Sequence, residues 1–282
     1  RDVERSRGLG DVYKRQVRYW RMVLAMTYVF EASNVRCSIM VDGERRTIFS
    51  GLSFAIEPGE IVDLVGPSGA GKSSLLTAFA RLNPRASGDL RLDGRSADDF
   101  TPQQWRAQVA YLPQKPVLLG ETVAQAIRLP FTLAIRQSAR TKQGPRRISP
   151  TDALPDGRIR ETLDNMGCAD IDLNRPPHDL SGGQAARVSL ARTLLTRPKV
   201  LLADEVDAGL DDDNAEKVAR ILAKAAADGM AIVRIRHRPP DGHATRVTRL
   251  ADGTLTQSGN AEADGTATGS TSTGNTVEGS VA

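Results

Sequence analysis

The chain has 282 residues, of which 40% are hydrophobic and 26% are charged, a balance typical of a folded domain. It has no run of about 18 apolar residues, which excludes a membrane-spanning helix. The formal net charge is +4, and residues 1–21, with seven basic and three acidic residues, carry all of it. The remaining residues are formally neutral, so we expect no nucleic-acid partner. Cys37 and Cys168 lie far apart without metal-ligand spacing, and we expect two reduced thiols.

Residues 1–21 differ in character from the rest of the chain. A basic arm for nucleic acid or lipid headgroups is one interpretation. We favour another, because Asp11–Gln16 matches the translation of a transposon end used to prepare sequencing libraries. We therefore expect a non-native or disordered leader, excluded from the fold, and a natural start at Met22 or Met26.

Strand-like patterns follow this leader. Short apolar runs between residues 28 and 56 predict strands, with a hairpin turn at Asp42-Gly43. Ile61–Val65 predicts a short buried strand, and Ser73–Leu82 predicts a helix after a glycine-rich loop. Another strand-like stretch surrounds residues 90–94.

The pattern changes to helical over residues 115–178. Basic residues, prolines and glycines interrupt it over residues 136–157, which predicts a solvated basic loop. Helix and strand patterns alternate again from residue 183 to residue 252. Residues 257–282 consist mostly of small polar residues and cannot bury enough apolar surface to fold, so we expect a disordered tail.

The glycine-rich loop fits the pattern G-x-x-x-x-G-K-[ST] between a predicted strand and a predicted helix. Glycines let successive backbone N–H groups point at phosphate oxygens, and the following helix adds its N-terminal dipole. We expect Lys72 to reach the β- and γ-phosphates of a nucleotide and the hydroxyl of Ser73 to bind Mg²⁺. The expected nucleotide contacts of this loop are Gly66, Pro67, Ser68, Gly69, Ala70, Gly71, Lys72, Ser73 and Ser74.

A second apolar strand, Val200–Glu205, ends in two consecutive carboxylates. Asp204 suits binding of Mg²⁺, through water, and Glu205 suits polarisation of an attacking water. A carboxylate pair at a strand end is also compatible with a merely solvated turn, but it occurs here together with a phosphate loop.

Leu180–Gln184 reads LSGGQ directly before a helical run, and this resembles the signature of ABC ATPases. The other motifs of that family follow in the family's order: Gln114 matches its glutamine loop, the segment ending at Asp211 resembles the loop that crosses its dimer, and His237 matches its switch histidine. The resemblance covers about residues 30–256.

The resemblance implies an α/β fold with a phosphate-loop NTPase core, an antiparallel β subdomain and an inserted α-helical subdomain. The ABC ATPase domain is then expected over residues 22–256, with the helical subdomain over about 115–178. It also implies ATP and Mg²⁺ as ligands. Glu205, His237 and Gln114 are the expected catalytic residues, and Ser73, Gln114 and Asp204 the expected contacts of the metal.

The resemblance further implies that two copies form a homodimer around ATP. Each ATP is expected between the phosphate loop of one chain and the signature of the other. The expected contacts from the second chain are Ser181, Gly182, Gly183, Gln184 and Asp211. An integral membrane permease subunit is the implied partner, which places the chain in the cytoplasm, peripheral at the inner membrane.

Two departures from the family pattern stand out. An aromatic residue that stacks on adenine is usual in the family, but the aligned positions here are Cys37 and Ile39, so Tyr28 or Phe30 is expected to substitute. Val206-Asp207 stands where Pro-Thr is common, which we expect to be tolerated.

Within the family, residues 114–123 and 129–131 look like the small ATPase of bacterial iron-efflux transporters. An ATPase of an uptake or lipid transporter is the main alternative. A soluble ABC protein of repair or translation is another alternative. Such proteins usually carry long coiled-coil insertions or two ATPase copies in one chain, and neither appears in this sequence. A regulatory homologue without hydrolysis is disfavoured by the intact Lys72, Asp204, Glu205 and His237.

One charge stands inside a predicted strand. Asp63 lies three residues before the phosphate loop, and Arg234 lies three before His237. The fold implied by the resemblance makes their strands parallel neighbours, and an unpaired buried carboxylate is costly. We therefore predict that Asp63 pairs with Arg234 or Arg236.

Overall fold

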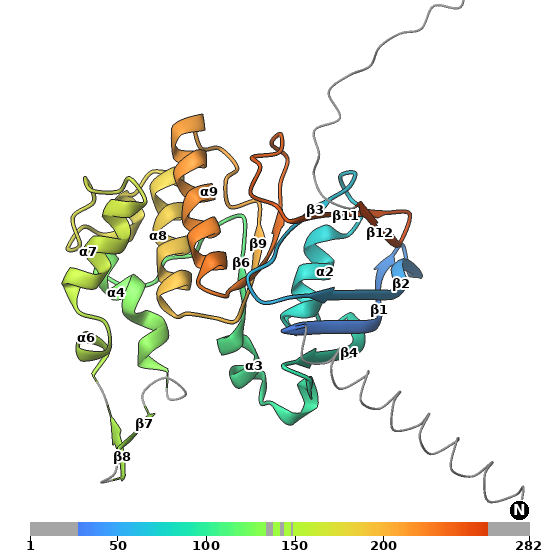
Figure 1. The fold of residues 1–282 in the computed structure, drawn as a ribbon, viewed down its shortest axis with the longest axis horizontal. Helices are drawn as coiled ribbons and strands as arrows, with labels where there is room; N and C mark the ends of the chain where they lie inside the picture. The colour runs from blue at the N-terminus through green and yellow to red at the C-terminus, as the bar shows by residue number, and fades with distance from the viewer. Residues whose placement is uncertain (1–27, 134–137, 142–143, 148, 259–282) are drawn as a thin grey trace, which may run out of the picture.

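A computed structural model describes residues 28–133, 138–141, 144–147 and 149–258 (Figure 1). The predicted leader, residues 1–21, lies outside the described residues, as does the predicted tail beyond residue 258. Two large β-sheets and a group of helices make up the described part, which confirms the predicted α/β class. Among the described residues, no helix combines the length and the apolar character needed to cross a membrane.

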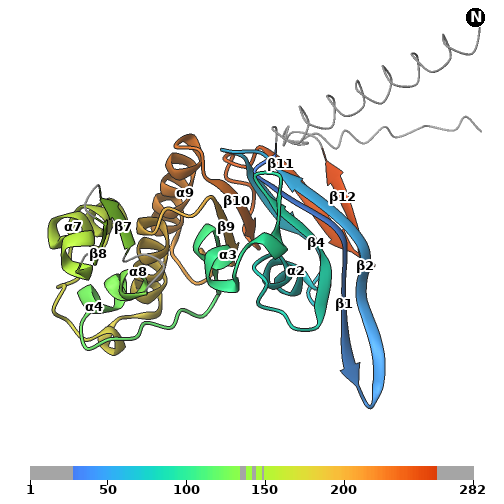
Figure 2. The same ribbon diagram turned by 90° about the horizontal axis from the view of Figure 1, so that it is seen from below.

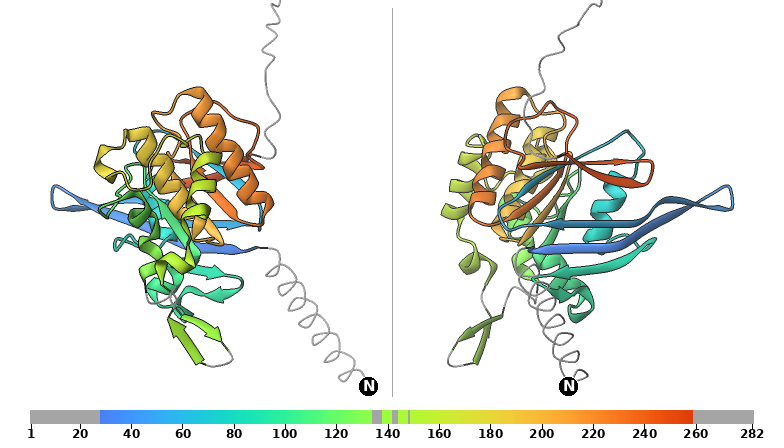
Figure 3. Two further views of the ribbon diagram at one scale, coloured as in Figure 1. Left: turned by 90° about the vertical axis from the view of Figure 1, so that its left-hand side faces the viewer. Right: turned by 45° about the vertical axis from the view of Figure 1, so that its right-hand side comes forward.

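The first sheet of the described part is antiparallel, in the order β2-β1-β4-β5. Its strands are β1 (Phe30–Val41), β2 (Glu44–Ile56), β4 (Ala86–Leu92) and β5 (Arg95–Ser96). β1 and β2 form a long hairpin that projects from the body of the molecule (Figure 3). Its turn is the predicted Asp42-Gly43, with φ of 51° and 84°, values that favour these two residue types.

The second sheet has the order β12-β11-β3-β10-β9-β6 among the described residues, with β12 antiparallel and the other pairs parallel. Its strands are β3 (Ile61–Val65), β6 (Val109–Leu112), β9 (Val200–Asp204), β10 (Ala231–Ile235), β11 (Arg246–Ala251) and β12 (Thr254–Ser258). The predicted strand Ile61–Val65 is confirmed, and the strand predicted over Val200–Glu205 ends one residue earlier, because Glu205 has a left-handed φ of 51°.

Helix α2 (Lys72–Phe79) lies between the two sheets (Figure 2). It ends three residues earlier than the predicted Ser73–Leu82, because Arg81 has a left-handed φ of 54° that turns the chain. Around it, Phe30 packs on Phe79 with ring centroids 5.1 Å apart, and Trp105 of α3 (Pro102–Gln108) closes the core.

A second core lies on the other face of the parallel sheet. Its described helices are α4 (Val123–Arg128), α6 (Pro150–Ala153), α7 (Asp156–Asn165), α8 (Gly182–Leu195) and α9 (Asp212–Ala227). Alternate strand residues supply the two cores: Leu202 and Val233 pack with the α2 side, and Leu201 and Ile232 with the helical side. Figure 1 shows α8 and α9 covering this face.

The prediction of a basic loop over residues 136–157 is wrong for the described part of that segment. β7 (Ser138–Thr141) and β8 (Gly144–Arg147) pair as an antiparallel hairpin, and α6 and α7 follow. The prolines were interpreted as breakers, but Pro150 occupies the first turn of α6 and Pro155 precedes α7. Proline is tolerated at a helix start, because its missing N–H would have no partner there.

Candidate functional site

Four segments that carry predicted site residues meet at one edge of the parallel sheet. Ile235 of β10 is in register with Leu64 of β3 on one side and with Asp204 of β9 on the other, and Leu112 of β6 is in register with Ala203. The phosphate loop, His237, the carboxylate pair and Gln114 each follow one of these strand ends. Parallel strands bring their carboxyl ends together, so the fold creates the cleft position in which such sheets bind ligands.

Two glycines of the phosphate loop are required by its geometry. Gly66 has φ of 148°, and a Cβ there would lie 2.0 Å from the carbonyl oxygen of Leu250. Gly71 has φ of 96°, and a Cβ there would lie 2.5 Å from Cγ2 of Ile48. Only glycine fits both positions, and the backbone can therefore curl tightly around a ligand.

The side chain of Lys72 is buried against the first two residues of this loop. Its Nζ donates to the carbonyl oxygens of Gly66 at 2.8 Å and Pro67 at 3.1 Å. No side chain caps the start of α2, whereas Ser181 and Gln184 form a capping box on α8. The first N–H groups of α2 are thus left to bind an anion, and with the ammonium of Lys72 they suit a phosphate group.

Glu205 stands between two other predicted site residues. Nε2 of Gln114 donates to its Oε2 at 2.6 Å, and Nε2 of His237 lies 2.7 Å from its Oε1. The backbone of Glu205 has φ of 51°, a left-handed conformation that is strained for glutamate. Three residues predicted from separate motifs are thereby brought together around one carboxylate.

Asp204 has a partner that the motifs did not reveal. The hydroxyl of Tyr111 in β6 donates to its Oδ2 at 2.9 Å. Burial, together with this hydrogen bond and the nearby negative charge, raises the pKa of Tyr111. In the sequence, Tyr111 could be noticed only as a tyrosine in the strand that leads to Gln114. Its pairing with Asp204 could not be predicted, because the sequence alone does not show that β6 lies beside β9.

The signature residues lie at the start of α8. The hydroxyl of Ser181 accepts from the N–H of Gln184 at 3.2 Å, and Nε2 of Gln184 donates to Asp170 at 2.8 Å. A Cβ at Gly183 would lie 3.1 Å from Leu210. Within the described part of the chain, these contacts run to α8 itself and the segments beside it, and not to the phosphate loop of the same chain.

Asp211 is the N-cap of α9, accepting from the N–H of Asn214 at 2.8 Å. Arg187 of α8, which the sequence did not single out, joins the two helices through Asn214 at 2.5 Å. It also donates to the carbonyl of Gly167 at 3.1 Å. The helix of the signature and the segment of Asp211 are therefore joined by a direct hydrogen bond.

The predicted pairing of Asp63 is confirmed. Nε of Arg234 lies 2.5 Å from Oδ1 of Asp63, and their side chains are 3% and 8% exposed. The two residues are in register across β10 and β3. Asp241 is a further partner of Arg234 that the sequence did not reveal, at 2.7 Å.

Neither aromatic residue expected to stack on adenine is available. Phe30 is fully buried in the core between the sheets. Tyr28 lines a pocket with Pro58 and Glu60, which precede β3, whereas the phosphate loop follows β3. Tyr28 is thus at the opposite edge of the sheet, and both expectations are wrong.

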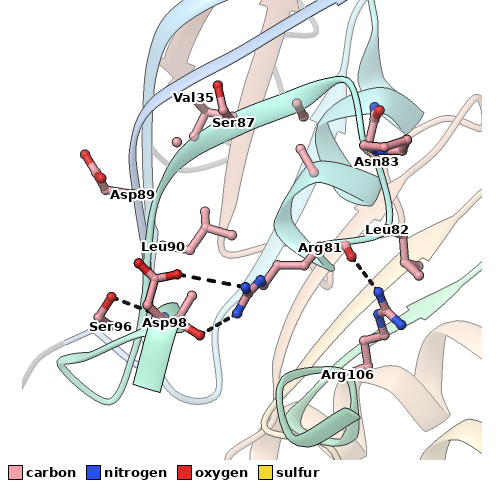
Figure 4. Close-up of a pocket in the computed structure, with 15 residues that line it drawn as sticks. Val35, Arg81, Leu82, Asn83, Ser87, Asp89, Leu90, Ser96, Asp98 and Arg106 are labelled. Carbon is pink, nitrogen blue, oxygen red and sulfur yellow. Dashed lines mark hydrogen bonds and ion pairs between the residues drawn. The ribbon is translucent and has the colours of Figure 1, made fainter. Parts of the chain in front are cut away.

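A separate pocket of about 520 Å³ lies at the C-terminal end of α2 (Figure 4). Arg106 donates to the carbonyl of Arg81 at 2.8 Å, and Arg81 lies 3.9 Å from Asp98. Its lining includes none of the predicted site residues. This pocket is therefore separate from the strand ends at which the predicted site residues meet.

Comparison with known proteins shows the family of this chain. The family model for the ABC transporter matches residues 49–208. A lipoprotein-releasing system ATP-binding protein, LolD, of Maricaulis maris is 34% identical over 81% of this chain and 96% of its own length. The probable iron export ATP-binding protein FetA of Escherichia coli is 32% identical, over 72% of this chain and 84% of its length.

A methionine import ATP-binding protein, MetN 1, of Pseudomonas fluorescens is 35% identical over 74% of this chain. The match spans only 60% of the length of MetN 1. Among solved structures, a bacterial Atm1-family ABC exporter with ATP bound has a TM-score of 0.67 at 26% identity, covering 83% of this chain and 39% of that one. The chain belongs to the ABC transporter family. It is an ABC ATPase cassette, with the phosphate-loop NTPase fold predicted from its motifs.

Proposed function

We propose that this chain is the ATP-hydrolysing subunit of a transporter whose membrane-spanning subunits are separate chains. The observation that carries the proposal is the carboxylate of Glu205, held between Gln114 and His237 at the same end of the sheet as the phosphate loop. A carboxylate so placed suits a general base for water, and the loop suits the phosphates of ATP.

The donor set fits ATP and Mg²⁺. The glycine cradle, Lys72 and the open N-terminus of α2 suit the phosphates. Ser73, Asp204 and Gln114 offer hard oxygen ligands for Mg²⁺, which commonly takes one carboxylate together with waters and substrate phosphates. The metal would neutralise negative charge that develops on the phosphate oxygens.

In the proposed reaction, Glu205 orients a water and accepts its proton as the water oxygen bonds to the γ-phosphorus. The bond from that phosphorus to the bridging oxygen breaks, which leaves ADP and inorganic phosphate. Lys72 stabilises the transferred group. His237, whose Nε2 lies 2.7 Å from Oε1 of Glu205, orients that carboxylate and is proposed to steady the γ-phosphate.

We propose that two copies are needed for a complete site. Ser181 caps the N–H of Gln184, whereas Gly182 and Gly183 stand ahead of it in the first turn of α8, and we propose that their N–H groups bind a phosphate brought by a second chain. Support comes from a similar solved structure, a dimeric post-hydrolysis ATP-binding cassette bound to ADP and Pi.

The membrane partner is proposed to dock on exposed apolar residues that follow Gln114 in the chain. Val117, Leu119 and Leu133 are 62%, 60% and 54% exposed, and such apolar exposure is typical of a protein interface. The chain would then lie at the cytoplasmic face of a membrane, held there by its permease.

For the cargo, we propose metal efflux, supported by the local resemblance of residues 114–123 and by FetA among the relatives. Lipoprotein release is a second candidate, supported by the 96% coverage of LolD.

The test is phosphate release from ATP and Mg²⁺ by the purified chain, with Glu205→Gln beside Glu216→Gln, an exposed glutamate of α9. Loss of activity only in Glu205→Gln supports the function, and an inactive wild type contradicts it. Equal activity in all three proteins refutes the role of Glu205 as the base. Copurification of a multi-span protein from the native membrane tests the partner, and iron accumulation in a strain lacking the gene tests the cargo.

A further inference from the structure

His237 lies in a stretch without regular structure. β10 ends at Ile235, β11 begins at Arg246, and residues 236–245 between them form neither helix nor strand. The side chain of His237 is 56% exposed, so packing holds it little. Its position near Glu205 must be set by other contacts of this connection.

A network of buried charged side chains supplies those contacts. Nη2 and Nη1 of Arg234 donate to the two oxygens of Asp241 at 2.7 Å and 2.9 Å, while its Nε binds Asp63. Nη1 of Arg236 forms an ion contact with the same Asp241 at 2.5 Å. Asp241, in the middle of the connection, is thereby bound to two arginines at the end of β10 and just after it.

The network also reaches the segment after the proposed base. Nε of Arg236 donates to Oδ2 of Asp207 at 3.0 Å, with side chains 8% and 11% exposed. On the other side of His237, Arg238 binds Asp212 at 2.7 Å and the carbonyl of Leu210. Both sequence neighbours of His237 therefore bind residues within 207–212, a segment that begins two residues after Glu205.

We propose that Arg236 and Asp207 are positioning residues for ATP hydrolysis, which fix His237 relative to Glu205 by joining the connection after β10 to the segment after β9. The proposal rests on the proposed function. Neither residue touches the reacting atoms. They act through His237, and misplacement of a catalytic group by about 1 Å lowers a rate by up to roughly 100-fold.

The decisive variant is Asp207→Asn. The network of Asp63, Asp207, Asp241, Arg234 and Arg236 has three carboxylates and two guanidinium groups, so this change balances its charge and we expect the protein to fold. The kcat for ATP should fall by about tenfold to 100-fold, with KM nearly unchanged, because the phosphate loop follows a different strand. Arg236→Met should act in the same way, and Arg220→Met, at an exposed pair on α9, is the matched control.

A double variant separates positioning from a general structural effect. In a His237→Ala background, Asp207→Asn should leave kcat unchanged, because the group that it positions is gone. A further fall by the same factor as in wild type would overturn the proposal, as would an unchanged kcat in the single Asp207→Asn variant.

Hydrogen exchange tests the same link without hydrolysis. Backbone amides of residues 236–245 should exchange faster in Asp207→Asn than in wild type or Arg220→Met. Unchanged exchange overturns the proposal even if the chain hydrolyses no ATP. Inactivity of the wild type, by contrast, would contradict the proposed function alone.

Discussion

Nε2 of His237 lies 2.7 Å from Oε1 of Glu205, while Gln114 contacts the other oxygen of the same carboxylate at 2.6 Å. The two contacts come from the ends of different strands, β10 and β6, on either side of β9. The carboxylate is therefore oriented by side chains of the protein, which reduces the reorganisation that catalysis requires.

Glu205→Gln should keep ATP binding and lower the rate of hydrolysis by roughly 10²–10⁴-fold, the usual share of a general base. The substitution preserves shape, and the phosphate loop is untouched. Unhydrolysed ATP should then hold two copies together, which gel filtration with ATP and Mg²⁺ would detect as a dimer beside a monomer in ADP.

Lys72→Ala is the contrasting control for that experiment. It removes the ammonium that lies over the loop, so ATP affinity should fall and no dimer should form. Near-normal phosphate release by Glu205→Gln would contradict the assignment of the base.

Tyr111→Phe should raise the Mg²⁺ concentration needed for half-maximal hydrolysis by roughly tenfold to 100-fold. The reason is the lost hydrogen bond of 2.9 Å that orients Asp204. A magnesium titration of phosphate release is the measurement, with Tyr28→Phe at the opposite sheet edge as the control. Identical titrations for all three proteins would mean that Tyr111 does not orient the metal carboxylate.

Gly71→Ala should lower the free energy of unfolding by about 1–3 kcal/mol, because the left-handed backbone is strained for alanine. The new Cβ would also meet Cγ2 of Ile48 at 2.5 Å. Urea unfolding measures this, and Ile48→Ala in the same chain should recover only the steric part. Gly157→Ala in α7, where a Cβ meets nothing within 4 Å, should be neutral or slightly stabilising, and an equal loss there would remove the argument.

Asp241 should contribute stability that depends on pH. Burial alone would raise its pKa, but hydrogen bonds from Arg234 and from the N–H of His243, with the charges of Arg234 and Arg236, bring the pKa below its ordinary value of 3.8. A carboxyl whose pKa is lower in the folded state stabilises the fold fully above the ordinary value, and less as the pH falls through the folded value.

The stability difference between wild type and Asp241→Asn should therefore be constant near neutral pH and shrink below about pH 4. Urea unfolding at a series of pH values checks this. A difference that stays the same down to the acid unfolding of the protein would show that Asp241 gains nothing from its ionised form.

Local sequence patterns predicted much of the fold. The strand Ile61–Val65, the turn Asp42-Gly43 and the phosphate loop were predicted because each depends on neighbouring residues alone. The pairing of Asp63 with Arg234 was predictable because the family resemblance implied which strands are neighbours.

Contacts between distant segments were the part that the sequence could not supply. Tyr111, Asp207 and Asp241 acquire their partners only when loops and strands far apart in the chain come together. Phe30 failed as a ligand contact for a related reason: a strand position reveals alternation, but not which face is buried beneath the second sheet.

The left-handed backbone at Glu205 also separates two like charges that are adjacent in sequence. Asp204, still in strand conformation, meets Tyr111 of β6, while the turn in the chain directs the next carboxylate to Gln114 and His237. Each carboxylate thus has hydrogen-bond partners of its own. One backbone angle of 51° directs two consecutive carboxylates to different surroundings, which the proposed function assigns to a cation and to a water molecule.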